Sequence, residues 1–359
     1  MTNITPVVSI IIPCRNEAHF IDRCLESVFA FEPVDGDFEV LVVDGLSNDA
    51  TREKLAEWKL REPRLHVLDN PARIVPIAMN IGIRAARGQW LVRLDAHSEY
   101  PPDYLRLCIE TSNYTGAENV GGVFITQPRG NTLQARLVQA LTTHRFGVGQ
   151  SDYRLDAQEG SADTVPYGCY RREVLERIGL FDERLVRNQD YELNRRLLHN
   201  GGQIWCNPKI QVFYYNQGTL RGLYRQALFT GQWNPWTWYV APYAFAPRHA
   251  IPGAFVMALL GALLLSLVAP RRGLPLIALI LAPYTTLAFF SAWQQARRYG
   301  WWMFFVLPFL FFSYHCAYGA GILWGSARLL LRTSPVQRSA FDSQPELAPN
   351  GSASRDNPI

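Results

Sequence analysis

The feature that most constrains this chain is a change in character after Arg248. Charged residues become rare there, and three apolar segments follow, at residues 251–269, 274–293 and 301–324. Each is close to the roughly 20 apolar residues that a membrane-spanning helix needs. The sequence therefore predicts a membrane-anchored protein whose soluble part lies at the amino-terminal end.

Arginines near the apolar segments bear on their topology. Pairs at 271–272 and 297–298 occupy both short loops, so the preference of Lys and Arg for the cytoplasmic side does not choose an orientation. Three full spans would place Arg328, Arg332 and Arg338 outside, which that preference disfavours. We expect a transmembrane region over residues 250–326 with two to three spans, one of them re-entrant or interfacial. Residues 327–359, rich in Ser, Pro and Asn, are expected to be a disordered tail.

The first two hundred residues alternate short apolar runs with segments of helical period, which is typical of a parallel sheet wrapped by helices. The pattern predicts an α/β fold of the doubly wound type, in a globular domain over residues 1–218. Gly88 is expected to close the third helix. The expected strands are 7–13, 38–44, 65–68 and 90–95, and the expected helices are 20–30, 51–58 and 76–86.

Composition and missing motifs exclude several classes of protein. The net charge is only +4 and no basic cluster alternates with aromatic residues in the soluble part, so nucleic acid is a poor candidate partner. The loop after the first strand contains neither GxGxxG nor a Walker lysine, which argues against dinucleotide dehydrogenases and P-loop enzymes. Six cysteines without CxxC spacing indicate reduced thiols. The soluble part is therefore expected in the cytoplasm.

Polar residues follow the predicted strands, where ligands bind in doubly wound sheets. Asp95 and His97 come directly after the fourth strand with one residue between them, so both side chains can face the same point. Such a pair is half of a site for Mg²⁺ or Mn²⁺, whose remaining ligands are diphosphate oxygens. The alternative, a turn-capping Asp beside a surface His, is equally consistent with the pair alone.

Three motifs in order resemble family 2 glycosyltransferases: SIIIPCRNE at 9–17, VVDGLSND at 42–49, and DAH at 95–97. The resemblance implies a GT-A-type nucleotide-sugar-binding domain, a divalent cation, and a UDP-sugar held by the first two loops. The family pattern has two acidic residues and a glycine where Asp44, Gly45 and Leu46 stand here. Helix capping and turn formation are the alternative role for the loop carboxylates. The residues predicted to bind the donor are Pro13, Asn16, Glu17, Asp44, Ser47, Arg73, Asn80 and Asp95, with core packing as the alternative for Arg73 and Asn80.

The segment RNQDYELNRR at 187–196 resembles the part of the family that carries the catalytic base. The resemblance implies that Asp190 is the base, because a sugar hydroxyl needs a proton acceptor to attack the anomeric carbon. Inversion of that carbon is then expected. The alternative is that Asp190 only stabilises the first turn of a helix through the dipole. Gln189 stands where the family usually has another acid.

A narrower resemblance, to the ExoA-like subgroup of succinoglycan-type exopolysaccharide assembly, rests on residues 70–76, 93–97, 146–149, 179–183 and 187–194. It implies transfer of one hexose, often glucose from UDP-glucose, to a polyprenyl-diphosphate-linked saccharide in exopolysaccharide or cell-surface glycan synthesis. It also implies a bacterial inner membrane location with the catalytic domain in the cytoplasm. Other polysaccharide-assembly enzymes are candidate partners.

Residues 219–249 combine basic and aromatic side chains directly before the first apolar segment, which predicts an amphipathic, interfacial stretch. Arg221 and Arg225, one helical turn apart, are predicted to bind the lipid diphosphate, together with Gln226 and Trp233. The stretch resembles the QxxRW motif of polymerising members only loosely, which favours a single addition.

Two other functions remain open at this point. One is a polyprenyl-phosphate sugar synthase, whose acceptor is the bare lipid phosphate. The other is a catalytically silent membrane subunit that binds nucleotide sugar, which Gln189 and Gly45 suggest.

Overall fold

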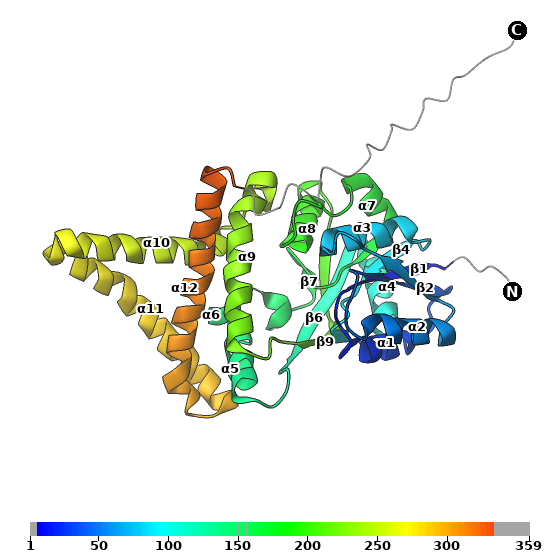
Figure 1. The fold of residues 1–359 in the computed structure, drawn as a ribbon, viewed down its shortest axis with the longest axis horizontal. Helices are drawn as coiled ribbons and strands as arrows, with labels where there is room; N and C mark the ends of the chain where they lie inside the picture. Colours follow the sequence, from blue (N-terminus) through cyan, green and yellow to red (C-terminus); the bar gives the residue numbers. More distant parts are fainter. Residues whose placement is uncertain (1–5, 150, 156, 334–359) are drawn as a thin grey trace, which may run out of the picture.

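The computed structural model describes residues 6–149, 151–155 and 157–333. It consists of a mixed nine-stranded sheet covered by helices, and a group of long helices packed beside it (Figure 1). Most of the expected disordered tail, including Arg338, lies outside the described residues.

Four parallel strands form the first half of the sheet in the order β3-β2-β1-β4. Strands β1 and β2 are almost entirely buried, as expected for strands covered on both faces. The predicted α/β architecture is confirmed. The elements of this half are β1 Val8–Cys14, α1 Ile21–Phe29, β2 Phe38–Asp44, α2 Thr51–Arg61, β3 Leu65–Asp69, α3 Val75–Ala85 and β4 Trp90–Arg93.

The second half of the sheet is mixed, which the sequence did not predict. Strand β8 pairs antiparallel with both β4 and β6, while β6 and β9 are parallel. The shortest strands have two or three residues, too few to produce a periodic pattern. The elements are β5 Ser98–Glu99, α4 Tyr104–Thr115, β6 Asn119–Gln127, α5 Leu133–Thr142, α6 Arg145–Val148, β7 Gly160–Ser161, β8 Cys169–Arg171, α7 Arg172–Ile178, α8 Gln189–His199 and β9 Ile204–Tyr215.

Gly88 does not cap α3 as expected. The helix ends at Ala85, and its C-cap Ala86 is already extended, with φ −63° and ψ 144°. A Cβ atom on Gly88 would lie 2.6 Å from the backbone nitrogen of Ser9 and from the carbonyl carbon of Val8. Glycine is therefore required because the chain passes directly against β1.

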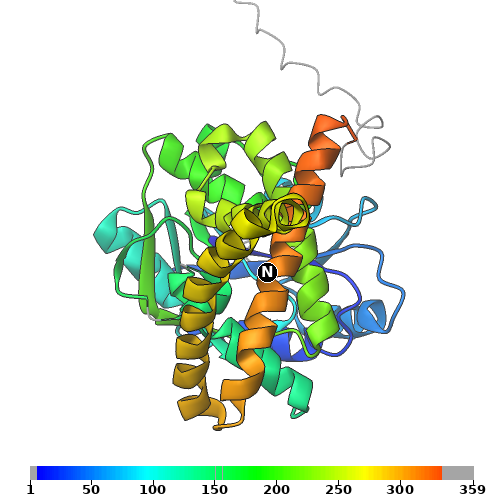
Figure 2. The ribbon, with the colours of Figure 1, turned by 90° about the vertical axis from the view of Figure 1, so that its left-hand side faces the viewer.

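Four long helices complete the chain: α9 Leu220–Val240, α10 Pro247–Val268, α11 Pro270–Tyr299 and α12 Met303–Leu330. The last three are long and apolar enough to cross a membrane. Helix α10 points away from the sheet, roughly perpendicular to α9 and α12 (Figures 1 and 2). Helix α11 returns obliquely, and α12 then runs beside α9.

Helix α12 is packed more closely into the protein than α10 or α11. Its Met303, Leu307 and Phe311 are fully buried in a cluster with Leu137 and Leu141 of α5. Glycines allow close contact with α9 farther along: a Cβ atom on Gly321 would lie 2.2 Å from the Leu228 carbonyl oxygen. One face of α12 therefore covers α5 and α9.

Candidate active site

The first two strands end side by side, because Cys14 pairs with Asp44 in the parallel register. Asp44 is fully buried, and its carboxylate accepts hydrogen bonds from the backbone N–H and the hydroxyl of Ser47. Arg52 Nε lies 3.5 Å from the same carboxylate. Asp44 thus organises its own loop, which is the capping and turn role expected as the alternative.

Loop 13–17 is joined to the Asp44 loop by hydrogen bonds from backbone N–H groups to side-chain oxygens. Asn16 donates from its N–H to Ser47 Oγ at 2.8 Å, and its Oδ1 accepts from the Asn48 N–H at 2.9 Å. The N–H of Glu17 donates to Thr51 Oγ1 at 2.9 Å. The loops therefore form one rigid edge that leaves the Asn16 side chain exposed and Pro13 partly exposed.

The family pattern and this chain differ at Gly45 and Leu46, and the structure shows the local effect. Leu46 has a φ of +53°, in the left-handed region that favours glycine. A Cβ atom on Gly45 would lie 3.2 Å from Arg15 Cδ, so a side chain there would have to displace Arg15. Leu46 therefore adopts the left-handed backbone conformation that a glycine at position 46 would adopt more readily.

The two donor residues predicted from the third helical region differ in accessibility. Arg73 is exposed in the loop between β3 and α3, where its N–H donates to the Asn70 carbonyl at 3.1 Å. Asn80 is 2% exposed. Its amide donates to the Phe181 carbonyl at 2.9 Å and accepts from the Phe181 N–H at 3.0 Å. Its amide therefore joins α3 to the segment before α8, which fits the packing alternative, and the donor role of Asn80 stays a prediction.

Asp95, His97 and Glu17 converge at the end of β4. His97 Nδ1 lies 2.8 Å from Asp95 Oδ1 and 3.5 Å from Glu17 Oε1. Burial opposes protonation of His97, but the charge and hydrogen bond of Asp95 and a hydrogen bond to Glu17 hold its pKa well above its ordinary value. Conversely, burial acts to raise the pKa of Asp95, yet His97 and Arg93 lower it. The ring of Tyr214 packs 5.9 Å from the His97 ring.

No group of three or more His, Cys, Asp or Glu side chains forms a complete metal site in the described part of the chain. Asp95 and His97 fit the half-site predicted for a divalent cation, since a carboxylate and an imidazole lie within hydrogen-bonding distance at a strand end. Such a half-site requires further ligands from a nucleoside diphosphate.

Arg93 connects the half-site to the predicted base. One nitrogen of its guanidinium contacts the carboxylate of Asp190, and the other lies 3.9 Å from Asp95 Oδ2. Burial opposes the charge of Arg93, but Asp190 and Asp95 outweigh it and raise the pKa of Arg93 above its ordinary value. Tyr167 supports the guanidinium, with its ring centroid 5.6 Å away. The sequence analysis gave Arg93 no role, although it stands in one of the quoted motifs.

Asp190 lies in the first turn of α8 with a side chain that is 39% exposed. The N-cap Asn188 has a φ of +64°, and its amide donates to Asn234 of α9 at 2.8 Å. Asn234 in turn donates to the hydroxyl of Tyr318 on α12 at 2.9 Å. Gln189 is almost fully buried, so it faces the core beside the accessible Asp190.

Two further arginines lie near Asp190 and His97, and sequence reasoning missed both. Arg154 stacks on Tyr214, with its guanidinium carbon 5.1 Å from the ring centroid. Arg187 donates to Thr230 of α9 at 3.2 Å and interacts electrostatically with Tyr214 and Asp190. Neither has a carboxylate within ion-pair distance in the ranges that the structure describes. Arg187 belongs to a quoted motif, whereas Arg154 lies in a loop without any local signal.

The acceptor residues predicted on α9 have different surroundings. Arg221 and Arg225 are exposed and Gln226 is partly buried. Trp233 is 1% exposed, so the structure corrects the expectation that it faces lipid headgroups.

Comparison with known proteins agrees with this geometry. Residues 9–179 match the family described as glycosyl transferase family 2. The succinoglycan biosynthesis protein ExoO of Rhizobium meliloti is 32% identical over 258 residues, which are 69% of this chain and 70% of that protein. The chain belongs to glycosyl transferase family 2.

Two other family 2 relatives and one solved structure extend the comparison. The ExoA protein of Rhizobium meliloti is 33% identical, over 60% of this chain and 66% of that protein, slightly less than two thirds of its length. Glycosyltransferase AglE of Haloferax volcanii is 30% identical over 64% of this chain and 81% of its own length. The structure of mannosyltransferase PcManGT from Pyrobaculum calidifontis, with GDP-Man and Mn²⁺, aligns over 90% of this chain and 88% of its own, with a TM-score of 0.55 and 22% identity. Because this alignment covers 90% of the chain, the similarity in fold includes carboxyl-terminal helices as well as the GT-A-like sheet domain.

Proposed function

We propose that this chain is an inverting, membrane-anchored hexosyltransferase that uses a nucleotide-sugar donor and a lipid-linked saccharide acceptor. The observation that carries the proposal is the position of Arg93, whose guanidinium contacts Asp190 and lies 3.9 Å from Asp95. The candidate base Asp190 and the candidate cation ligand Asp95 therefore both lie next to the buried guanidinium of Arg93. An acceptor hydroxyl beside Asp190 and a donor diphosphate beside Asp95 would both lie next to Arg93, which favours their reaction with each other.

The proposed donor is UDP-glucose, held at the edge made by the loops after β1 and β2. Asn16, Ser47 and Arg73 are the donor contacts that remain accessible or partly accessible there, and Asp44 fixes the loop from beneath. Pro13 and Glu17 complete the edge. The choice of uridine and of glucose rests on the resemblance to the ExoA-like subgroup.

Asp95 and His97 would hold a Mn²⁺ or Mg²⁺ ion together with the donor diphosphate. When bound, the ion neutralises charge that develops on the leaving diphosphate. Arg93, Arg154 and Arg187 add positive charge on the same side. Positive groups fixed in advance stabilise such charge without reorganising during the reaction.

Asp190 would accept the proton of the acceptor hydroxyl. The hydroxyl oxygen forms a bond to the anomeric carbon while the bond from that carbon to the diphosphate oxygen breaks. Attack opposite the leaving group inverts the anomeric carbon. Arg93 and the Asn188 cap orient the carboxylate for this step.

The proposed acceptor is a polyprenyl-diphosphate-linked saccharide in exopolysaccharide or cell-surface glycan synthesis. Support comes from the printed names of relatives: two are succinoglycan biosynthesis proteins, and a 28% identical relative from Methanococcus voltae acts on a dolichyl phosphate-linked sugar. Arg221, Arg225 and Gln226 on α9 are the proposed lipid contacts. Helix α9 leads through the short turn Pro242–Ala244 into the first apolar helix, α10 (Figure 1).

We place the catalytic domain on the cytoplasmic side of a bacterial inner membrane. The six cysteines are all free and five are buried, which suits a reducing compartment. Other polysaccharide-assembly enzymes are proposed as neighbours in the membrane, since the acceptor must be made by one transferase and extended by another.

The decisive experiment compares Asp190→Asn with Asp95→Ala in the full chain, using UDP-glucose and a lipid-linked saccharide. Loss of a general base lowers a rate by roughly 10²–10⁴-fold, so Asp190→Asn should lose transfer at that level and keep donor binding. Asp95→Ala should instead lose Mn²⁺-dependent donor binding. Product formation by thin-layer chromatography and donor binding by calorimetry measure the two effects.

Three results would contradict parts of this proposal. Undiminished transfer by Asp190→Asn removes the base assignment. Product formed only on bare polyprenyl phosphate favours the lipid-phosphate synthase. Absence of turnover with every common donor favours the silent subunit.

A further inference from the structure

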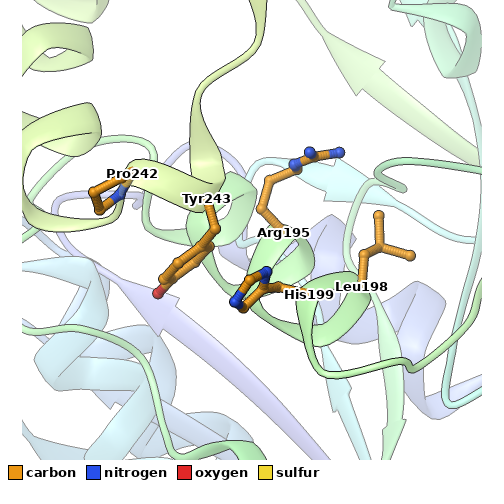
Figure 3. A pocket seen from close by; sticks show the side chains of 5 residues that line it. All are labelled: Arg195, Leu198, His199, Pro242 and Tyr243. Atoms are coloured by element: carbon orange, nitrogen blue, oxygen red, sulfur yellow. The ribbon is translucent and has the colours of Figure 1, made fainter.

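A cavity of about 520 Å³ lies between α8 and the short turn Pro242–Ala244 that precedes α10. Arg195, Leu198 and His199 line it from α8, and Pro242 and Tyr243 from the turn (Figure 3). Tyr191 lies one helical turn before Arg195 and therefore shares its face of α8. Asp190 is one residue earlier, about 100° around the helix, so the cavity belongs to a different face from the proposed base.

Two neighbouring arginines on α8 have opposite environments. Arg196 donates to the Glu192 carboxylate and, at 3.0 and 2.8 Å, to the carbonyls of Ile178 and Leu180. Arg195 has neither a hydrogen bond nor an ion pair within the described ranges, although its Nε atom is buried. A guanidinium that is partly withdrawn from water without a partner is unfavourable. The cavity therefore carries an uncompensated positive charge.

A second donor on the same face also lacks a partner. The hydroxyl of Tyr191 is buried and makes no hydrogen bond to any described residue. Its ring packs against that of His249, with centroids 4.8 Å apart. Burial raises the pKa of Tyr191, against the opposing effect of Arg248 and Arg195, so the hydroxyl stays protonated and able to donate. The nearby Arg248 already has Asp163 as its ion-pair partner.

The cavity lies at the start of α10, whose apolar window has the highest mean hydropathy of the three helices that could cross a membrane in the described part of the chain. Helix α10 begins at Pro247 and has a window of mean hydropathy 2.4. Aromatic side chains surround its start: Tyr239 is 66% exposed and Phe245 46% exposed. Such aromatic residues gather at the level of lipid headgroups, where the phosphates of the bilayer lie.

We propose that this cavity binds the phosphate of an anionic phospholipid, with Arg195 as its charge partner. The Tyr191 hydroxyl, which is not part of the lining but lies on the same face of α8 one turn from Arg195, would be a second donor. The site goes beyond the proposed transfer reaction and lies apart from the proposed acceptor contacts on α9. A bound lipid would anchor the carboxyl-terminal part of α8 to the membrane surface where the chain enters it.

The test is native mass spectrometry of the full chain in detergent, titrated with phosphatidylglycerol and, in parallel, with phosphatidylcholine. We expect one phosphatidylglycerol to be retained in preference to phosphatidylcholine. Charge-assisted hydrogen bonds are the strong ones, so Arg195→Gln should weaken retention by about tenfold or more. Tyr191→Phe should weaken it by a smaller factor and leave the melting temperature unchanged, because the hydroxyl has no described partner to lose.

The matched control is Arg177→Gln on α7, which removes the same charge from an exposed arginine paired with Glu118. It should bind phosphatidylglycerol as the unmodified chain does. A third titration with polyprenyl phosphate separates the two sources of lipid phosphate. Equal retention by Arg195→Gln, no preference over phosphatidylcholine, or displacement of phosphatidylglycerol by polyprenyl phosphate at this site would each overturn the proposal.

Discussion

Around the donor edge, single residues hold backbone conformations that most side chains avoid. Asn16, Leu46 and Arg73 have φ values of 57°, 53° and 61°, and each lies in a loop near the ends of β1 to β3. Asparagine tolerates this region, but leucine does so only at a cost. Unfavourable local conformations concentrate at binding sites, where the surrounding hydrogen bonds hold them in place.

We expect Leu46→Gly to stabilise the protein. Relief of the left-handed conformation, about 1–2 kcal/mol, exceeds the additional entropy that glycine gives the unfolded chain, about 0.5–1 kcal/mol. The melting temperature in detergent should rise by roughly 2 °C. Leu60→Gly, at an 88% exposed position inside α2, is the control and should lower it. A fall for Leu46→Gly as well would show that the Leu46 side chain stabilises the loop.

Between elements, a short polar chain joins the membrane-side helices to the proposed base. Asn188 at the start of α8 donates to Asn234 of α9, and Asn234 donates to Tyr318 of α12. Asn234 is 3% exposed, so water does not replace these bonds. The beginning of α8, and with it Asp190, is thus positioned directly by α9 and, through Asn234, by the apolar helix α12.

Asn234→Ala should therefore reduce turnover by about tenfold or more, since small displacements of a catalytic group are costly. The KM for the nucleotide sugar should change little, because the donor edge lies on other strands. Tyr224→Phe is the control: it breaks an exposed 2.7 Å contact between α9 and α12, with Ser313, away from α8. Steady-state kinetics of both variants give the comparison. A similar loss in both would mean that general packing of α9 on α12 is responsible.

At the scale of the whole molecule, the helices that could cross a membrane do not form one uniform bundle. Helix α10 extends away from the catalytic domain, while α12 runs beside α9 and buries one face (Figures 1 and 2). A third of the apolar window of α12 is buried within the protein, against 11% for α10 and α11. Helix α12 is accordingly part of the support of the catalytic domain as well as an apolar helix.

Phe311→Ala and Phe309→Ala on α12 test this dual role. Phe311 is fully buried and packs 5.2 Å from the ring of Phe146, whereas Phe309 is 71% exposed. Truncating a buried phenylalanine costs about 3–5 kcal/mol, so Phe311→Ala should markedly lower the melting temperature in detergent. Phe309→Ala should leave it nearly unchanged. Equal effects would indicate that α12 leaves the catalytic domain in detergent.

The sequence alone determined the features that depend on near neighbours in the chain. Strands β1 to β4, the loops that follow them and the apolar lengths of α10 to α12 are visible as local patterns, because burial repeats with the period of each element. Only the tertiary structure decided which distant groups meet. Arg93 reaches Asp190 because β8 and its neighbours extend the sheet, and two-residue and three-residue strands leave no periodic signal. Asn80 is buried for the same kind of reason: the segment that its amide contacts, at Phe181, is about 100 residues farther along the chain.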